Sequence, residues 1–333
     1  VFFGDCRDTM RDLVAQGVKV QMCVTSPPYF GLRDYGHPGQ LGLEKTPAEF
    51  VAAMVEVFGL VRELLADDGV LFLNLGDSYN GYMANQRGTG LEAGRQHSRK
   101  YIEPGAGLRT STLKNKDLIG IPWRVAFALQ ADGWYLRQDI IWHKPNPMPE
   151  SVTDRCTKAH EYLFLLSKSE RYYFDARAIA QPIAESSKER LAQPNLPNQA
   201  GSDRVPGKTN GNMKAVGPRF GGNKYGDDDR EESRTKSGNE YTGGDGLANR
   251  RSVWTVPTVP YSGAHFATFP PALIEPCILA GSRSGDTVLD CFFGSGTTGE
   301  VAGNLGRNWI GCEINEQYAP LQRARTAQHG LAL

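Results

Sequence analysis

The stretch TVLDCFFGSGTT, residues 287–298, decides the fold of this chain. It reads as a short apolar strand, a glycine-rich turn and a helix that begins at about Thr297. Glycines permit a tight turn and let the backbone approach a ligand, while the free N–H groups at a helix start attract negative charge. The stretch therefore predicts a cofactor-binding turn at the end of a strand.

A second strand with a terminal acid narrows the kind of cofactor. Asn308–Glu313 reads as the next strand, and Glu313 lies 23 residues after Asp290. An acid there suits the two ribose hydroxyls of an adenosine. The turn lacks the G-x-G-x-x-G spacing typical of nicotinamide cofactors, so we expect another adenosine-containing cofactor. A purely structural turn is the alternative.

Outward from this turn, apolar strands alternate with helices. Thr46 reads as a helix N-cap with Pro47 in the first position, and Asp67-Asp68-Gly69 reads as a turn. Alternating strands and helices predict an α/β fold with a doubly wound, mostly parallel sheet. The expected strands are Val1–Gly4, Val18–Val24, Gly69–Leu75, Trp134–Lys144, Glu161–Lys168 and Asp286–Asp290, and the expected helices are Pro47–Leu65, Ile121–Asp132 and one ending near Gly281.

Two long polar segments, Asn80–Asp117 and Pro182–Ser252, interrupt this alternation. Few aliphatic residues occur in the second, so it cannot easily build a core of its own. Between Ala84 and Lys116, seven Lys/Arg stand against two acids. Such a loop can contact phosphate, and a solvated loop is the alternative.

The overall composition excludes several classes of protein. Among 333 residues, 37 basic side chains balance 37 acidic ones, so net charge alone does not indicate a polyanion partner. The six cysteines form no C-x-x-C pair, which favours reduced thiols over disulfides or a metal site. Neither a long apolar run nor a signal peptide is present, so we expect no membrane partner and a cytoplasmic location.

The tetrapeptide Ser26-Pro27-Pro28-Tyr29 follows the apolar run at 18–24 and carries the candidate chemistry. The Ser26 hydroxyl and the Pro27 carbonyl can accept both hydrogens of an amino group on an aromatic ring, and the prolines fix that geometry. Tyr29 offers a flat face on which an extruded base can stack. A proline-rich linker is the alternative, which the position at a strand end disfavours.

The two motifs, with the catalytic one first, resemble the permuted, beta-class DNA amino-methyltransferases of bacteria and phages. Four further stretches extend the resemblance over roughly residues 1–175 and 252–325. They are TSPPYFGLRDYG (25–36), LGDSY (75–79), residues 121–142, and HKPNPMPE (143–150) continuing to KAHEY (158–162). The resemblance implies a Rossmann-like methyltransferase fold with an inserted target-recognition region. Residues 1–175 would be its catalytic part, 176–251 the insertion, and 252–333 its cofactor-binding part.

The resemblance also implies S-adenosyl-L-methionine as the cofactor. Glu313 would hold the ribose, Asp5 would lie near the adenine amino group, and the 290–296 turn would line the methionine end. The implied cofactor contacts are Asp5, Cys6, Thr25, Thr268, Phe269, Asp290, Phe292, Gly294, Ser295, Gly296, Thr297, Thr298 and Glu313.

Double-stranded DNA with a specific short sequence is the partner that the resemblance implies. We expect phosphate and base contacts from the basic loop and from the insertion. The alternative for the insertion is a flexible segment without such a role. A homodimer and a restriction endonuclease partner are further expectations. We also expect the protein to be associated with the nucleoid of a bacterium or to be encoded by a phage. The expected DNA contacts are Arg95, Arg99, Lys100, Arg204, Lys208 and Lys214.

The target atom and two rival functions stay open at this point. The long matching stretches favour N6 of adenine, whereas serine at position 26 favours N4 of cytosine. A methyltransferase acting on glutamine or RNA is a rival, although such enzymes usually place the cofactor turn before the tetrapeptide. A catalytically silent DNA-binding protein of the same fold is the other.

Overall fold

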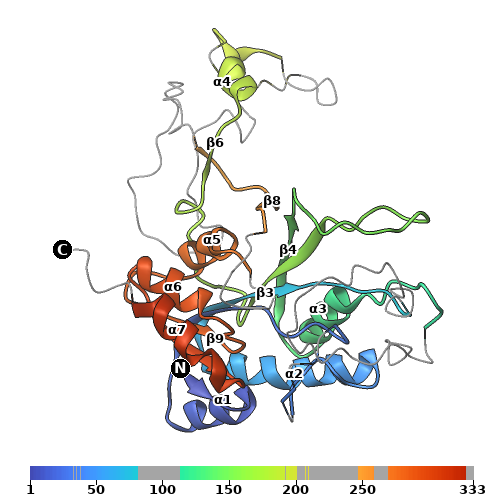
Figure 1. The fold of residues 1–333 in the computed structure, drawn as a ribbon. Coiled ribbons are helices and arrows are strands. Elements are labelled where there is room, and N and C mark those ends of the chain that lie inside the picture. The colour runs from blue at the N-terminus through green and yellow to red at the C-terminus, as the bar shows by residue number, and fades with distance from the viewer. Residues whose placement is uncertain are drawn as a thin grey trace. The chain divides into compact units, whose positions relative to one another are not determined.

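The computed structural model describes residues 1–32, 34, 36–37, 39–81, 113–191, 193–200, 207, 209, 247–258 and 269–327 (Figure 1). The chain forms two compact units. The first comprises residues 1–178 together with 251–333, and the second comprises residues 179–250. In the described residues, no helix is both long enough and apolar enough to cross a bilayer.

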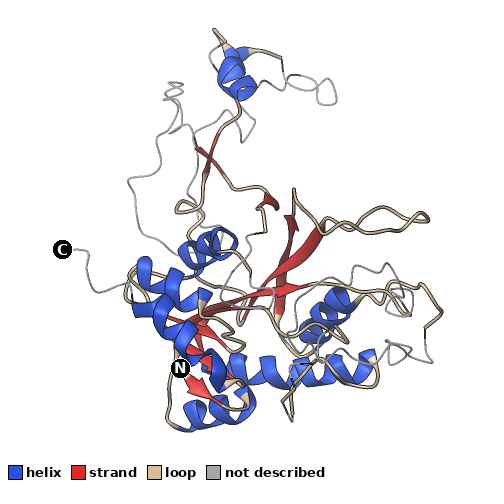
Figure 2. Cartoon of the chain, in the orientation of Figure 1, coloured by secondary structure: helices blue, strands red, loops and turns tan. Residues whose placement is uncertain are grey.

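The first unit is built on an eight-stranded sheet (Figure 2). Its strand order is β1-β10-β9-β2-β3-β5-β4-β8, and only β5 runs antiparallel to its neighbours. The predicted doubly wound, mostly parallel sheet is therefore confirmed. The strands are β1 (Phe2–Phe3), β2 (Val20–Thr25), β3 (Leu65–Leu75), β4 (Tyr135–His143), β5 (His160–Ser167), β8 (Val253–Thr255), β9 (Thr287–Asp290) and β10 (Asn308–Glu313).

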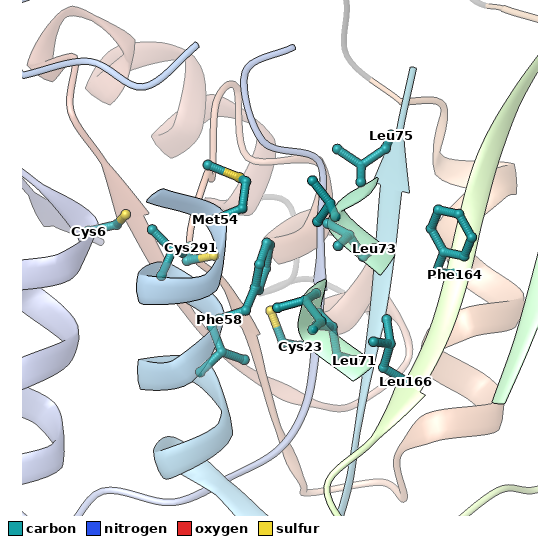
Figure 3. Packing of buried hydrophobic residues seen from close by; sticks show 14 of the residues in the cluster. Cys6, Cys23, Met54, Phe58, Leu71, Leu73, Leu75, Phe164, Leu166 and Cys291 are labelled. Carbon is teal, nitrogen blue, oxygen red and sulfur yellow. The ribbon is translucent and has the colours of Figure 1, made fainter. Parts of the chain in front are cut away.

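Helices cover both faces of the sheet. One core cluster joins α1 (Cys6–Ala15), α2 (Pro47–Leu64) and α3 (Ile121–Ala131) to one face, and a second joins α5 (Pro271–Gly281) and α6 (Thr297–Asn304) to the other. Alternate residues of β3 serve the two clusters, because successive strand side chains point to opposite faces. Figure 3 shows Met54 and Phe58 of α2 facing Leu71 and Leu73 of β3. A strand buried on both faces explains the continuous apolar run of β3.

The start of α2 confirms the predicted cap. The Thr46 hydroxyl accepts a hydrogen bond from the Glu49 N–H at 3.1 Å, and the Glu49 carboxylate accepts one from the Thr46 N–H at 3.1 Å. This reciprocal capping box satisfies two N–H groups that the first helical turn leaves free. Thr46 and Pro47 therefore set where α2 begins.

The turn predicted at Asp67-Asp68-Gly69 lies within the bounds of β3, where residues 66–69 leave the ladder between the paired Leu65 and Val70. Leu65 takes an extended conformation (φ −64°, ψ 142°) that ends α2 and starts β3, and it pairs with Val20. The ladder shifts register between Val20 and Met22, which accommodates the bend. A β-carbon on Gly69 would lie 2.9 Å from the carbonyl oxygen of Ala66, three residues earlier, so the chain turns here and glycine permits the close approach.

The second unit has little regular structure in its described residues. An antiparallel pair joins β6 (Gln181–Pro182) to β7 (Leu247–Ala248), and α4 spans Glu185–Leu191. A 3-10 turn follows at Leu196–Asn198. Ile179 and Leu196 are buried apolar side chains among these residues. That this unit recognises a target sequence stays a prediction.

Candidate active site at the carboxyl edge of the sheet

The two sequence motifs lie side by side at one edge of the sheet. Strands β2 and β9 are parallel neighbours, with Met22 opposite Val288 and Cys23 opposite Leu289. The carboxyl ends of the two strands therefore meet, although their last residues, Thr25 and Asp290, stand 265 positions apart in the chain. Ligands of open α/β sheets bind outside the carboxyl ends of the strands, where this meeting occurs.

A buried carboxylate joins the two motifs. Asp290 is 1% exposed, and burial raises its pKa above the ordinary range. Its Oδ1 accepts hydrogen bonds from the Thr25 hydroxyl at 2.6 Å and the Phe292 N–H at 3.0 Å. Its Oδ2 accepts one from the Thr298 hydroxyl at 2.6 Å. The side chains of Thr25, Asp290 and Thr298 are thus engaged with one another, and their predicted cofactor contacts stay predictions.

Two glycines of the turn have left-handed backbones that favour glycine. Gly294 has φ +52° and Gly296 has φ +91°. A β-carbon on Gly296 would stand 3.4 Å from the Cα of Gln322, so this glycine is packed against protein. Among the described residues, a β-carbon on Gly294 would meet nothing nearer than the Phe292 carbonyl oxygen at 3.9 Å. Gly294 therefore borders open space, as a cradle for a ligand requires.

Glu313 stands at the end of β10 and is tied to the turn. Its Oε2 accepts a hydrogen bond from the Gly294 N–H at 2.7 Å, and its Oε1 accepts one from the Asn315 N–H at 2.9 Å. Burial raises the pKa of Glu313 to about 7, against the opposing effect of these two N–H donors. Each carboxylate oxygen has a second lone pair, so both can accept a further hydrogen bond.

The helix α7 (Ala319–Thr326) bonds to the glycine-rich turn at residues 294–297. A short 3-10 helix at Glu316–Tyr318 precedes α7. Gln322 is buried, and its amide donates to the Gly294 carbonyl at 2.7 Å. Arg325 Nη1 donates to the hydroxyls of Ser295 and Thr297, each at 2.6 Å. Sequence reasoning assigned both hydroxyls to the cofactor and missed Gln322 and Arg325, which belong to no motif.

The remaining predicted cofactor residues lie near this edge or outside the described residues. Asp5 follows β1 and caps α1, and its carboxylate pairs with the Arg7 guanidinium at 2.5 Å. The hydrogen bond from Arg7 lowers the pKa of Asp5. Cys6 is buried, which raises its pKa, and Phe269 packs against the second core cluster.

Seven predicted contact residues fall outside the part of the chain that the structure describes. One was assigned to the cofactor and six to DNA, and all of these assignments stay predictions. They are Thr268, Arg95, Arg99, Lys100, Arg204, Lys208 and Lys214.

The Ser26–Tyr29 tetrapeptide packs against two glycines that sequence reasoning did not single out. Pro27 is buried, while Ser26, Pro28 and Tyr29 are partly exposed. A β-carbon on Gly42, which has φ +98°, would stand 3.2 Å from both Pro28 Cβ and the Tyr29 carbonyl oxygen. A β-carbon on Gly76 would stand 2.4 Å from Cε2 of the Tyr29 ring. Both glycines therefore permit the close packing that fixes the tetrapeptide.

The hydroxyls of Thr25 and Ser26 differ in their surroundings. Thr25 bonds to Asp290, as described above. Within the described residues, the Ser26 hydroxyl has no hydrogen-bond partner. A partly exposed hydroxyl without a protein partner can accept a hydrogen bond from a substrate.

Comparison with solved structures identifies the class of fold. The chain superposes on PvuII DNA methyltransferase (cytosine-N4-specific) with a TM-score of 0.56 and 17% identity, covering 97% of this chain and 84% of the other. It superposes on TTHA0409 of Thermus thermophilus, solved in complex with S-adenosyl-L-methionine, with a TM-score of 0.52 and 20% identity, covering 100% and 96%. The fold is that of the Rossmann-like methyltransferases.

Sequence comparison then gives the family. The family described as DNA methylase matches residues 20–323. Type II methyltransferase M.SmaI of Serratia marcescens is 40% identical, covering 98% of this chain and 89% of the relative. Type II methyltransferase M.Cfr9I of Citrobacter freundii is 42% identical, covering 96% and 85%. The chain belongs to the DNA methylase family, as the two motifs predicted. Methylation of glutamine or RNA is thereby set aside.

Proposed function

We propose that this chain transfers a methyl group from S-adenosyl-L-methionine to an exocyclic amino nitrogen of a base within a short, specific duplex sequence. One observation carries the proposal. The pairing of β2 with β9, tied by the Asp290 carboxylate, sets Ser26–Tyr29 beside the glycine turn. Methyl transfer in a single step requires that the residues that hold the amino group lie next to those that hold the cofactor.

The residues of the turn fit an adenosine-containing cofactor. Gly294 leaves space for the ligand to approach the backbone. Glu313 has lone pairs that can accept hydrogen bonds from the ribose hydroxyls. When bound, S-adenosyl-L-methionine supplies a methyl group on a positively charged sulfur. Asp290, Gln322 and Arg325 hold the turn around that space.

The tetrapeptide prepares the amino nitrogen for attack. Its lone pair is delocalised into the base ring, which makes it a weak nucleophile. The Ser26 hydroxyl and the carbonyl oxygen of buried Pro27 accept hydrogen bonds from the two N–H groups of the amino nitrogen. These hydrogen bonds direct the nitrogen lone pair toward the cofactor. The base has to leave the duplex to reach this position, and it stacks on the Tyr29 ring.

Two target atoms suit this chemistry, and each has an observation in its favour. The long stretches that resemble the permuted family favour N6 of adenine. Serine at position 26, in place of aspartate, favours N4 of cytosine as the second candidate. The DNA contacts, a homodimer and a restriction endonuclease partner stay predictions.

Mass spectrometry of DNA nucleosides tests the proposed function. DNA from a host that expresses this chain is expected to contain N6-methyladenine or N4-methylcytosine above the level of the empty host. A host that expresses the Ser26→Ala variant serves as the control and should match the empty host. If 5-methylcytosine or no new methylated nucleoside is found, the proposed reaction is wrong.

The raised pKa of Glu313 predicts a pH dependence of cofactor binding. Only the carboxylate accepts hydrogen bonds from both ribose hydroxyls, so protonation below about pH 7 removes them. Calorimetry should show S-adenosyl-L-methionine affinity falling roughly tenfold per pH unit below that value and staying level above it. Glu313→Gln should bind more weakly and lose this dependence, whereas exposed Glu316→Gln should retain it. A flat profile in the parent would remove Glu313 from the site.

A further inference from the structure

Four polar side chains from separate segments meet around the hydroxyl of Tyr29. Tyr29 follows β2, Asn74 lies near the end of β3, Lys144 follows β4, and Glu161 lies at the start of antiparallel β5. All four therefore stand at the carboxyl edge of the sheet, beside the tetrapeptide. We call Asn74, Lys144 and Glu161 together the Tyr29 support.

The Tyr29 hydroxyl donates into this support. Its oxygen lies 2.5 Å from Glu161 Oε2 and 3.3 Å from Asn74 Oδ1. The Asn74 side chain is buried, and its amide nitrogen donates to Glu161 Oε2 at 3.3 Å and to the Tyr162 carbonyl at 3.1 Å. The Asn74 amide is thus held through two hydrogen bonds from its nitrogen, which fixes the oxygen that faces the Tyr29 hydroxyl.

An ion pair holds the first acceptor. Lys144 Nζ bonds to Oε1 of Glu161, the oxygen that Tyr29 does not use, and the two side chains are 18% and 15% exposed. The same ammonium stands 4.3 Å from the centre of the Trp142 ring, a favourable cation–π distance. A carboxylate held this way forms stronger hydrogen bonds than a neutral acceptor. The Tyr29 hydroxyl is accordingly anchored to a fixed charge.

The ring of Tyr29 also packs closely against the backbone of Gly76. A β-carbon on Gly76 would stand 2.4 Å from Cε2 and 2.8 Å from Cδ2 of this ring. The ring therefore lies against the Gly76 backbone while its hydroxyl is anchored at Glu161. Two separate restraints set its tilt, which is more than packing of an aromatic ring in a core requires.

We propose that the Tyr29 support positions the target base by setting the tilt of the ring on which that base stacks. A base on a tilted ring carries its amino nitrogen away from Ser26 and from the line of methyl transfer. A misplacement of about 1 Å can cost roughly a hundredfold in rate. Asn74, Lys144 and Glu161 are positioning residues here, since they act through Tyr29. The inference rests on the proposed function.

Removing the hydroxyl alone gives the cleanest test. Tyr29→Phe keeps the ring for stacking and leaves the Glu161–Lys144 ion pair intact. Tyr29→Phe and Glu161→Gln are each expected to lower kcat roughly ten- to a hundredfold. Tyr29→Phe removes the hydrogen bond and Glu161→Gln removes the charge of its acceptor, so the double variant should fall no more than about twofold below the less active single variant. KM for DNA and calorimetric affinity for S-adenosyl-L-methionine should stay at the parent values, which general damage to the fold would not allow.

Lys144 supplies a rescue and a matched control. Lys144→Met should lower kcat, and Lys144→Arg should restore most of it because the positive charge returns. Lys168 is 20% exposed and donates to the Leu65 carbonyl at 2.7 Å, at the opposite edge of the sheet. Lys168→Met should therefore keep the parent kcat.

The outcomes separate the inference from the function on which it rests. If the parent chain transfers no methyl group to DNA, the proposed function fails before any variant is compared. If the parent is active and Tyr29→Phe and Glu161→Gln match it, the positioning role is wrong. A kcat of the double variant that falls by the product of the two single losses would also overturn the positioning role. The two substitutions would then act on different interactions.

Discussion

Replacing Ser26 with alanine is expected to reduce methyl transfer on the order of a hundredfold or more. The change removes one of the two acceptors that we propose to hold the amino group. It removes no hydrogen bond within the described residues, because the Ser26 hydroxyl makes none there. Thermal unfolding and calorimetric binding of S-adenosyl-L-methionine should therefore match the parent.

Single-turnover transfer of a labelled methyl group to DNA measures this effect. Ser284→Ala is the matched control, because Ser284 is exposed near the amino end of β9 and bonds to the Gly306 carbonyl. That variant should transfer at the parent rate. A Ser26→Ala enzyme that turned over normally would show that the tetrapeptide does not hold the amino group.

Replacing Gly294 with valine is expected to remove most binding of S-adenosyl-L-methionine, by about a hundredfold or more, since blocked backbone approach forfeits several contacts at once. The new side chain would enter the open space that borders Gly294. Its left-handed backbone, φ +52°, adds a strain of about 1–2 kcal/mol for a residue with a β-carbon. That strain lowers stability slightly but does not by itself abolish binding.

The Gly285→Val variant distinguishes the effect of backbone strain from that of steric blockage of the cofactor. Gly285 has φ +84° with nothing within 4 Å of an added β-carbon, and it precedes β9 at the opposite edge. Both variants should lose a similar amount of stability in thermal unfolding, while only Gly294→Val loses cofactor binding in calorimetry. Equal binding by the two variants would place the cofactor away from this turn.

The sequence predicted the parts of the site that depend on local backbone chemistry. Glycines in the 287–298 stretch, the double proline and the caps are required by conformation at their own positions, so they can be recognised without the fold. The strand boundaries came close for the same reason, and β10 and the start of α6 match the prediction. The turn at Asp67-Asp68-Gly69 interrupts the strand instead of preceding it, because Leu65 already pairs with Val20.

The supporting residues could not be predicted, because their roles arise only from tertiary pairing. Glu161 and Lys144 occur in stretches that resemble the family, yet only the β4–β5 register and the closeness of β3 bring them to Tyr29. Gln322 and Arg325 belong to a polar helix without a motif. Ser295 and Thr297 were assigned to the cofactor by the family resemblance, which stays a prediction, and nothing local reveals that Arg325 also bonds to them.

The pairing of β2 with β9 also bears on how the chain matures on the ribosome. Strand β2 leaves the exit tunnel early and can pair with β3, but its other edge lacks a partner until residues 287–290 follow. An open strand edge is a template for unwanted association, so the nascent chain carries this risk until β9 is made. The cofactor cannot assist folding in that interval, because the turn proposed to bind it follows β9 in the chain. Competence for methylation should therefore appear in one late step, with no active fragment before it.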